Sequence, residues 1–176
     1  MSKSRFISAI VLLIAGALVA FLVITNEPQY QVGAEQGMIA PDFILPVWGT
    51  DEEASLEDFH GDIIVMNLWA SWCPPCIKEM PDLMKLYDDY QDKGVTVLGV
   101  NMNKYERTKT AMDEFMIDLN VTIPTVIDVD GEVADDYQIS ALPTTYIIDR
   151  EGVIQQVIRG EVNYEGLESI LLQMLD

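Results

Sequence analysis

The sequence predicts an α/β protein with a mixed central sheet flanked by helices, preceded by one N-terminal transmembrane helix. Continuous apolar runs at 62–70 and 95–101, typical of buried strands, alternate with segments of helical periodicity. Two more apolar runs flank residues 150–152, which contain Gly152, and predict a β-hairpin near the C-terminus. Residues 6–25 carry no charge and are long enough to span a bilayer.

The N-terminus predicts a signal anchor in a lipid bilayer. Residues 1–5 are basic, with Lys3 and Arg5, and a helix over 6–25 is about 30 Å long, the thickness of a bilayer core. By the positive-inside rule, residues 1–5 stay cytoplasmic and the remainder is exported. A cleaved signal peptide fits less well, since its apolar region usually has about 7–15 residues. A buried core helix is the third alternative.

Residues 26–37 are polar and contain Pro28, Gly33 and Gly37, which predicts a tether. We therefore expect the compact domain to cover 38–176. Near its start, "DFILPVW" and "EASLEDFHGD" suggest a short N-terminal hairpin.

The remaining elements follow from the period of their apolar residues. We expect strands at 62–70, 95–101, 125–129, 144–149 and 153–160. We expect helices at 76–91, 107–120 and 163–175. Crossovers through helices imply parallel central strands, and the late hairpin adds antiparallel ones.

The exported part is strongly acidic. All 29 Asp and Glu residues follow residue 25, where eight of the ten Lys and Arg residues lie. This balance excludes binding to nucleic acid or anionic lipid through a basic patch. A solvated acidic surface explains it most simply, because the acids are scattered; attraction to a basic partner and adaptation to a saline or alkaline exterior are the alternatives.

The two cysteines of the chain, Cys73 and Cys76, lie in "WASWCPPCIKEMP". As a structural staple the pair gains little, because a loop of about four residues yields roughly 2 kcal/mol against roughly 3 for a 15-residue loop. A thiolate-rich zinc site needs about four ligands, and the chain offers no third cysteine and one histidine, His60. We therefore predict no metal and a redox-active dithiol, for which C-x-x-C is a known motif.

Cys73 falls at the predicted start of a helix, with Cys76 about one turn inside it. The free N–H groups and the positive end of the helix dipole favour a thiolate at Cys73, which is the nucleophile in disulfide exchange. Pro74 and Pro75 suit the first turn, where a missing N–H costs nothing. Trp72 either shields the site or only packs.

Two further residues have open roles from the sequence alone. Glu79 lies three residues after Cys76, on the same helical face, where it could act as a base or raise thiol pKa values. An ordinary surface glutamate is the alternative. Pro143, in "ALPTT", opens a strand and either belongs to the site or merely ends a loop.

The segments "APDF", "LEDFHGDIIVMNLWASWCPPCIKEMPDL", "VTVLGVN" and "ALPTTYIIDREGVI" together resemble the ResA/TlpA-like membrane-anchored thiol-disulfide oxidoreductases. This group is a bacterial branch of the thioredoxin fold, and the resemblance covers roughly residues 38 to 175. It implies a thioredoxin-like fold with an N-terminal hairpin and an inserted helix–strand segment near 105–130.

The resemblance also implies roles for individual residues. Cys73 attacks, Cys76 resolves, and Pro143 is a cis-proline beside the disulfide where substrate chains align. Glu79 matches the family's active-site glutamate, and Asn67 stands where thioredoxins have a buried aspartate, which favours Glu79 as the proton handler. The predicted substrate-binding residues are Trp72, Pro74, Pro75, Leu142 and Pro143.

Relatives of this kind keep the haem-binding cysteines of apocytochrome c reduced and draw electrons from a membrane partner of the CcdA type. The resemblance therefore implies an extracytoplasmic protein-disulfide reductase in cytochrome c maturation, without a cofactor. Three alternatives stay open: an oxidant that forms disulfides, a peroxiredoxin-type peroxidase, and a non-catalytic tethered peptide-binding module. The peroxidase fits poorly, because Ala70 stands where peroxiredoxins place Thr or Ser three residues before the reactive cysteine.

Overall fold

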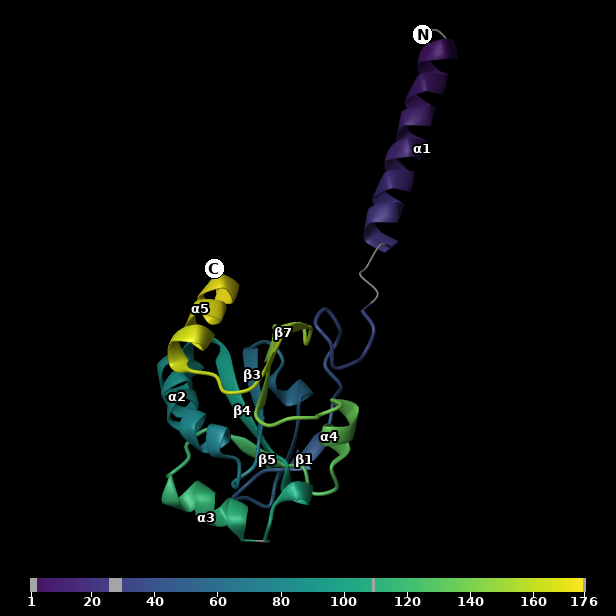
Figure 1. Cartoon of the computed structure of the whole chain (residues 1–176). Helices are drawn as coiled ribbons and strands as arrows, with labels where there is room; N and C mark the ends of the chain where they lie inside the picture. The colour runs from purple at the N-terminus through teal and green to yellow at the C-terminus, as the bar shows by residue number, and fades with distance from the viewer. Residues whose placement is uncertain (1–2, 26–29, 109, 176) are drawn as a thin grey trace. The chain divides into compact units, whose positions relative to one another are not determined.

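The computed structural model describes residues 3–25, 30–108 and 110–175 (Figure 1). The chain divides into two compact units, Met1–Tyr30 and Gln31–Asp176. Residues 1–2 of the predicted cytoplasmic N-terminus and residues 26–29 of the predicted tether lie outside the described residues. The predicted domain boundary between residues 37 and 38 stays a prediction.

The first unit contains the helix α1, Lys3–Thr25, which covers the predicted apolar segment. Several of its large apolar side chains are exposed, among them Leu12 and Leu13. Within the described residues, however, no helix combines the length and the apolarity needed to cross a membrane. The transmembrane span therefore stays a prediction.

The second unit begins with the predicted N-terminal hairpin and continues into a five-stranded sheet. The hairpin pairs β1 (Ile44–Pro46) with β2 (Glu53–Ser55) in antiparallel register. The sheet has the order β5-β4-β3-β6-β7. Its strands are β3 (Ile63–Trp69), β4 (Val95–Asn101), β5 (Thr125–Ile127), β6 (Thr144–Ile148) and β7 (Ile154–Arg159).

The sheet is mixed, as predicted. Strands β3, β4 and β5 run parallel, whereas β6 and β7 form the predicted hairpin and β6 pairs antiparallel with β3. The central strand β3 is buried at all seven positions, which explains why its sequence is a continuous apolar run.

Four helices accompany the strands of this unit: α2 (Pro74–Tyr90), α3 (Ala111–Asp118), α4 (Glu132–Asp136) and α5 (Tyr164–Leu175). Short 3₁₀ turns lie at Glu57–Phe59, Gln91–Lys93 and Asn103–Tyr105. The helix predicted over 107–120 is shorter than expected, because Arg107 and Thr108 lie in bends and α3 covers only Ala111–Asp118. Helix α4 was not predicted, since five residues with three acids show no helical period.

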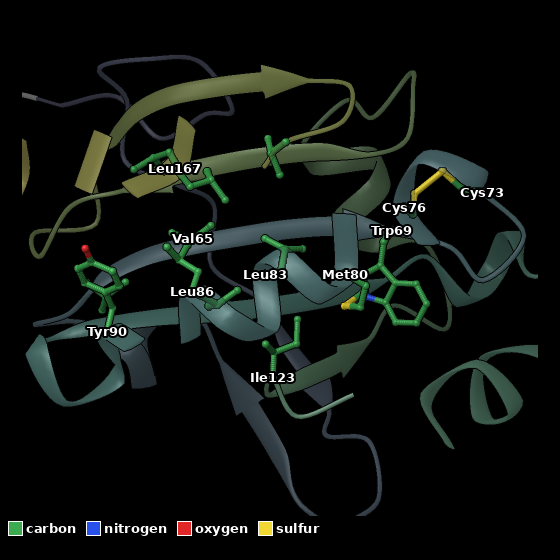
Figure 2. Packing of buried hydrophobic residues seen from close by; sticks show 14 of the residues in the cluster. Val65, Trp69, Cys73, Cys76, Met80, Leu83, Leu86, Tyr90, Ile123 and Leu167 are labelled. Carbon is green, nitrogen blue, oxygen red and sulfur yellow. A yellow bond between two sulfur atoms is a disulfide. The ribbon is translucent and has the colours of Figure 1, made fainter. Parts of the chain in front are cut away.

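Alternating side chains of β3 supply two apolar cores. On one face, Val65 and Trp69 belong to a cluster with Leu83 and Leu86 of α2 and Leu167 of α5 (Figure 2). On the other face, the cluster contains these residues of β3, α4 and the following turn: Ile64, Met66, Leu68, Val133 and Tyr137. The packing fixes α2 against the sheet, so the first turn of α2 is held directly after the end of β3.

Candidate active site

Cys73 and Cys76 are joined by a disulfide at the start of α2, with their Cα atoms 5.3 Å apart (Figure 2). Cys73 is the N-cap residue, in extended conformation, and Pro74 and Pro75 occupy the first helical positions as predicted. Cys73 is 3% exposed and Cys76 is fully buried, so the helix presents one sulfur at its mouth and hides the other.

The helix start favours negative charge on Cys73 once the disulfide is reduced. The orphan N–H groups of the first turn and the helix dipole both stabilise an anion at the N-cap. The backbone carbonyl of Cys73 already accepts the first helical hydrogen bond, from Ile77 N at 3.1 Å. The Cys73 thiol is therefore the one suited to act as the nucleophile.

Glu79 is buried in α2, with 1% of its surface exposed, and is not a surface glutamate. Its Oε1 accepts a hydrogen bond from Asn67 Nδ2 at 2.8 Å, and its Oε2 accepts one from Val162 N at 2.9 Å. Burial raises the pKa of Glu79 to about 7, against the opposing effect of these two hydrogen bonds. A carboxyl with this pKa changes protonation easily near neutral pH, as proton transfer requires.

Asn67 lies in the middle of β3 and is completely buried. Its Nδ2 donates to Glu79 and also to Thr145 Oγ1, at 3.0 Å, on the neighbouring strand β6. The Asn67 amide therefore connects the sheet to the Glu79 carboxyl of α2. Asn67 is the position at which thioredoxins have a buried aspartate, according to the sequence resemblance.

A groove of about 560 Å³ opens beside Cys73. It is largely apolar, and no charged side chain is among its lining residues. Of the predicted substrate-binding residues, Trp72, Pro74, Pro75 and Leu142 line it. The other lining residues, apart from Cys73, were not predicted: Met102, Tyr105, Ile139, Ser140 and Ala141.

Pro143 and Glu79 are not among the residues that line this groove. The peptide bond between Leu142 and Pro143 is cis, as the resemblance implied. The carbonyl of Pro143 accepts a hydrogen bond from Gly160 N at 2.9 Å, which ties the start of β6 to the end of β7.

The wall formed by Tyr105 is fixed by hydrogen bonds to the cysteine turn. Trp72 Nε1 donates to the carbonyl of Tyr105 at 2.9 Å. The carboxylate of Glu106 accepts from both the backbone N and the Oγ of Ser71, and also from Asn101 Nδ2. Glu106 was missed by the sequence analysis, because no local pattern joins it to a residue 35 positions earlier.

Among the described residues, no three His, Cys, Asp or Glu side chains are grouped so that they could hold a metal ion. The chemistry that the cysteine pair can perform is thiol–disulfide exchange.

The protein combines a mixed sheet of this strand order with a cysteine pair at the start of a helix and an apolar groove beside that pair. These features define a thiol-disulfide oxidoreductase with a thioredoxin-like fold. Comparison with known proteins agrees: the AhpC/TSA family matches residues 37–157. The chain belongs to this family, and the predicted likeness to ResA is confirmed by its relatives.

Two curated relatives illustrate the match. Thiol-disulfide oxidoreductase ResA of Oceanobacillus iheyensis is 35% identical over 173 residues, which cover 96% of this chain and 88% of the relative. Thioredoxin-like protein YneN of Bacillus subtilis is 38% identical over 141 residues, which cover 80% of this chain and 81% of the relative. Among solved structures, StoA of Bacillus subtilis superposes with a TM-score of 0.66 at 28% identity, over 76% of this chain and 97% of StoA.

Proposed function

We propose that this oxidoreductase reduces disulfides of protein substrates outside the cytoplasm, with Cys73 as the attacking and Cys76 as the resolving cysteine. The observation that carries the proposal is the position of Cys73, at the N-cap of α2 and in the lining of an apolar groove. An extended peptide that presents a disulfide fits such a groove, in which Trp72 and Leu142 offer apolar surface beside Cys73.

The reaction proceeds in two exchanges. The Cys73 thiolate attacks one sulfur of the substrate disulfide, forms a mixed disulfide, and releases the second substrate sulfur as a thiolate, which takes up a proton. The Cys76 thiol then loses its proton to the Glu79 carboxylate and attacks Cys73. The Cys73–Cys76 disulfide forms, and the first substrate sulfur leaves as a thiolate that Glu79 or water protonates. Two electrons pass from the dithiol to the substrate.

Glu79 is suited to the proton step by its place and its pKa. It lies one turn after Cys76 in α2, and burial brings its pKa close to neutral pH. Its two hydrogen bonds, from β3 and from the segment after β7, hold the carboxyl in one orientation.

As substrate we propose apocytochrome c, whose haem-binding cysteines must be reduced, and as electron donor a membrane protein of the CcdA type. The support is the resemblance to the ResA group, to which a relative covering 96% of this chain belongs by name. The direction of transfer is tested by equilibration with glutathione buffers. We expect a potential nearer thioredoxin's, about −270 mV, than DsbA's, about −120 mV. A value near DsbA's favours the disulfide-forming alternative.

We further propose that residues 6–25 anchor the chain in the bilayer, with 1–5 cytoplasmic, 26–37 as a tether and 38–176 as the external domain. The support is the helix α1 and its exposed apolar side chains. Protease added to intact spheroplasts should digest the external domain. A domain that resists the protease until the membrane is permeabilised refutes this topology.

Substrate trapping is the sharpest test of the function. In the Cys76→Ser variant, the mixed disulfide at Cys73 cannot be resolved, so substrates should stay covalently bound and be identified by mass spectrometry. Cys73→Ser is the matched control and should trap nothing. A trap that holds no haem-binding cysteine peptide refutes the proposed substrate, and peroxide turnover by the wild type supports the peroxidase alternative.

Full activity of a Cys73→Ser, Cys76→Ser double variant in cells establishes the remaining alternative, a non-catalytic peptide-binding module.

A further inference from the structure

The amide of Asn67 has an unusual set of partners. Its Nδ2 makes two hydrogen bonds, to Glu79 Oε1 and to Thr145 Oγ1. Within the described part of the chain, its buried Oδ1 has no hydrogen-bond partner. A buried acceptor without a donor is uncommon in folded proteins and calls for an explanation.

We propose that Asn67 is a positioning residue whose side-chain amide turns by about 180° when Glu79 gains a proton, so that it donates to the carboxylate and accepts from the carboxylic acid. The inference rests on the proposed function of Glu79 as the group that carries the proton of Cys76.

The observed orientation of the amide suits an ionised Glu79. A carboxylate only accepts hydrogen bonds, and here it receives one from Asn67 Nδ2 and one from Val162 N. After protonation, the new O–H on Oε1 needs an acceptor, and Nδ2 cannot serve as one. The unpaired Oδ1 is the acceptor on the same amide, and rotation about the last side-chain bond brings it to Oε1, while Val162 N keeps its bond to Oε2.

Thr145 permits either orientation. Its hydroxyl accepts from Nδ2 in the observed arrangement, and it can donate to Oδ1 after the rotation, because a hydroxyl is both donor and acceptor. The nitrogen and oxygen ends of an amide have nearly the same size, so the rotation needs no repacking of β3 or β6. After the rotation the amide again makes two hydrogen bonds, both through Oδ1, and Nδ2 takes the place in which Oδ1 has no partner in the observed orientation.

Few charged groups lie near Glu79, so the Asn67 amide is the main group that can adjust when Glu79 gains or loses a proton. The one charged side chain among the causes of its pKa shift is Glu161, from the segment after β7, which raises the pKa and is itself ion-paired with Lys78. The strands β3 and β6 contribute the neutral Asn67 and Thr145. Because the pKa of Glu79 is about 7, both protonation states are populated near neutral pH.

The catalytic consequence is a carboxyl that stays in place while its charge changes. When Glu79 takes the proton of Cys76, it retains a hydrogen bond to Asn67 in the new state and does not swing away from the thiol. When the proton leaves Glu79, the amide rotates back and Asn67 Nδ2 again donates a hydrogen bond to the carboxylate.

Nuclear magnetic resonance on the full-length, oxidised protein in detergent micelles tests the rotation without requiring turnover. The protein carries ¹⁵N-labelled Asn amides and ¹³C-labelled Glu carboxyls and is studied at pH values about 1.5 units below and above the Glu79 pKa. We expect the Asn67 NH₂ signals to follow the titration of the Glu79 carboxyl. The contact between the Asn67 NH₂ protons and the Thr145 methyl should be present at high pH and lost at low pH. The amide of Asn120 is the internal control.

A contact that persists at both pH values, with Asn67 signals that do not titrate, overturns the inference and leaves Asn67 as a fixed donor. The reductase function is measured separately, on the same protein after its Cys73–Cys76 disulfide has been reduced with dithiothreitol and the excess reagent removed. If the amide titrates but the protein reduces no protein disulfide, the proposed function fails and the rotation stands.

Two variants test the consequence for catalysis. Asn67→Leu removes the amide at nearly constant volume and should raise the pKa of Glu79, displace the pH profile of disulfide reduction upwards, and lower kcat/KM on the order of tenfold, the value of one hydrogen bond to a charged group. Asn101→Leu, at another fully buried asparagine of the sheet, should leave the Glu79 titration in place. An unchanged pH profile and Glu79 titration in Asn67→Leu overturn the positioning role.

Discussion

Replacing Glu79 by Gln should stabilise the oxidised protein at alkaline pH. The folded state holds this carboxyl at a pKa of about 7, whereas the unfolded chain holds it at its ordinary 4.5, because burial penalises the charge. Between these two values the folded state binds more protons than the unfolded state, so wild-type stability falls as the pH rises through that range. The difference corresponds to about 3 kcal/mol, at about 1.36 kcal/mol per pKa unit.

Gln carries no charge at any pH and has the shape of the protonated acid, so the variant escapes this loss. We expect Glu79→Gln to exceed the wild type in unfolding free energy by less than about 1 kcal/mol at pH 5 and by about 3 kcal/mol at pH 8. The lower limit stays above the isoelectric point of about 4.1, where the protein carries little net charge to keep it soluble.

Urea unfolding followed by tryptophan fluorescence measures these values. The three tryptophans, Trp48, Trp69 and Trp72, all lie in the unit Gln31–Asp176, so the signal reports the unfolding of that unit. Glu165→Gln, at an exposed position of α5, is the matched control for the loss of one negative charge. A stability difference between Glu79→Gln and wild type that is the same at both pH values refutes the claim that desolvation dominates the pKa of Glu79.

Three further outcomes follow from the site. In the reduced protein, iodoacetamide should modify Cys73 well before Cys76, because Cys73 is at the helix mouth and Cys76 is fully buried; equal rates by mass spectrometry contradict this assignment. Glu79→Gln should lower the thiol pKa values, by removal of a nearby negative charge, and should slow disulfide reduction, by loss of the proton carrier. If thiolate absorbance titration and rate are both unchanged, Glu79 has no catalytic role. Glu106→Ala should raise KM on the order of tenfold with little change in kcat. The variant loses the hydrogen bonds from Ser71 to the Glu106 carboxylate, and a hydrogen bond to a charged group contributes about the free energy of a tenfold change. An unchanged KM shows that the groove wall does not depend on Glu106.

The parts of the fold that were predictable are those whose signal is local. The buried run of β3, the helix start at Cys73 and the turn at Gly152 are each specified by a few neighbouring residues, and each appears where the pattern placed it. Helix α4 escaped prediction because its five residues contain too few apolar positions to show a period.

The surroundings of the cysteines were less predictable, because they are assembled from distant segments. The hydrogen bond from Val162 N to Glu79 joins residues 83 positions apart, and nothing in either neighbourhood signals it. The groove likewise combines Tyr105 and Ile139 with the cysteine turn. Spacing could place Glu79 on the face of Cys76, but only the packed structure decides that this face is buried.

The groove beside Cys73 is built from separate segments of the chain, and the hydrogen bonds between Glu106 and Ser71 hold two of them together. The cysteine turn is specified by β3 and α2, whereas Tyr105 is supplied by the loop between β4 and α3. If the groove binds substrate as proposed, changes in the segment that carries Tyr105 alter which peptides are accepted and leave the dithiol untouched. Such a change needs to keep one contact, the hydrogen bond from the backbone N of Ser71 to the carboxylate of Glu106.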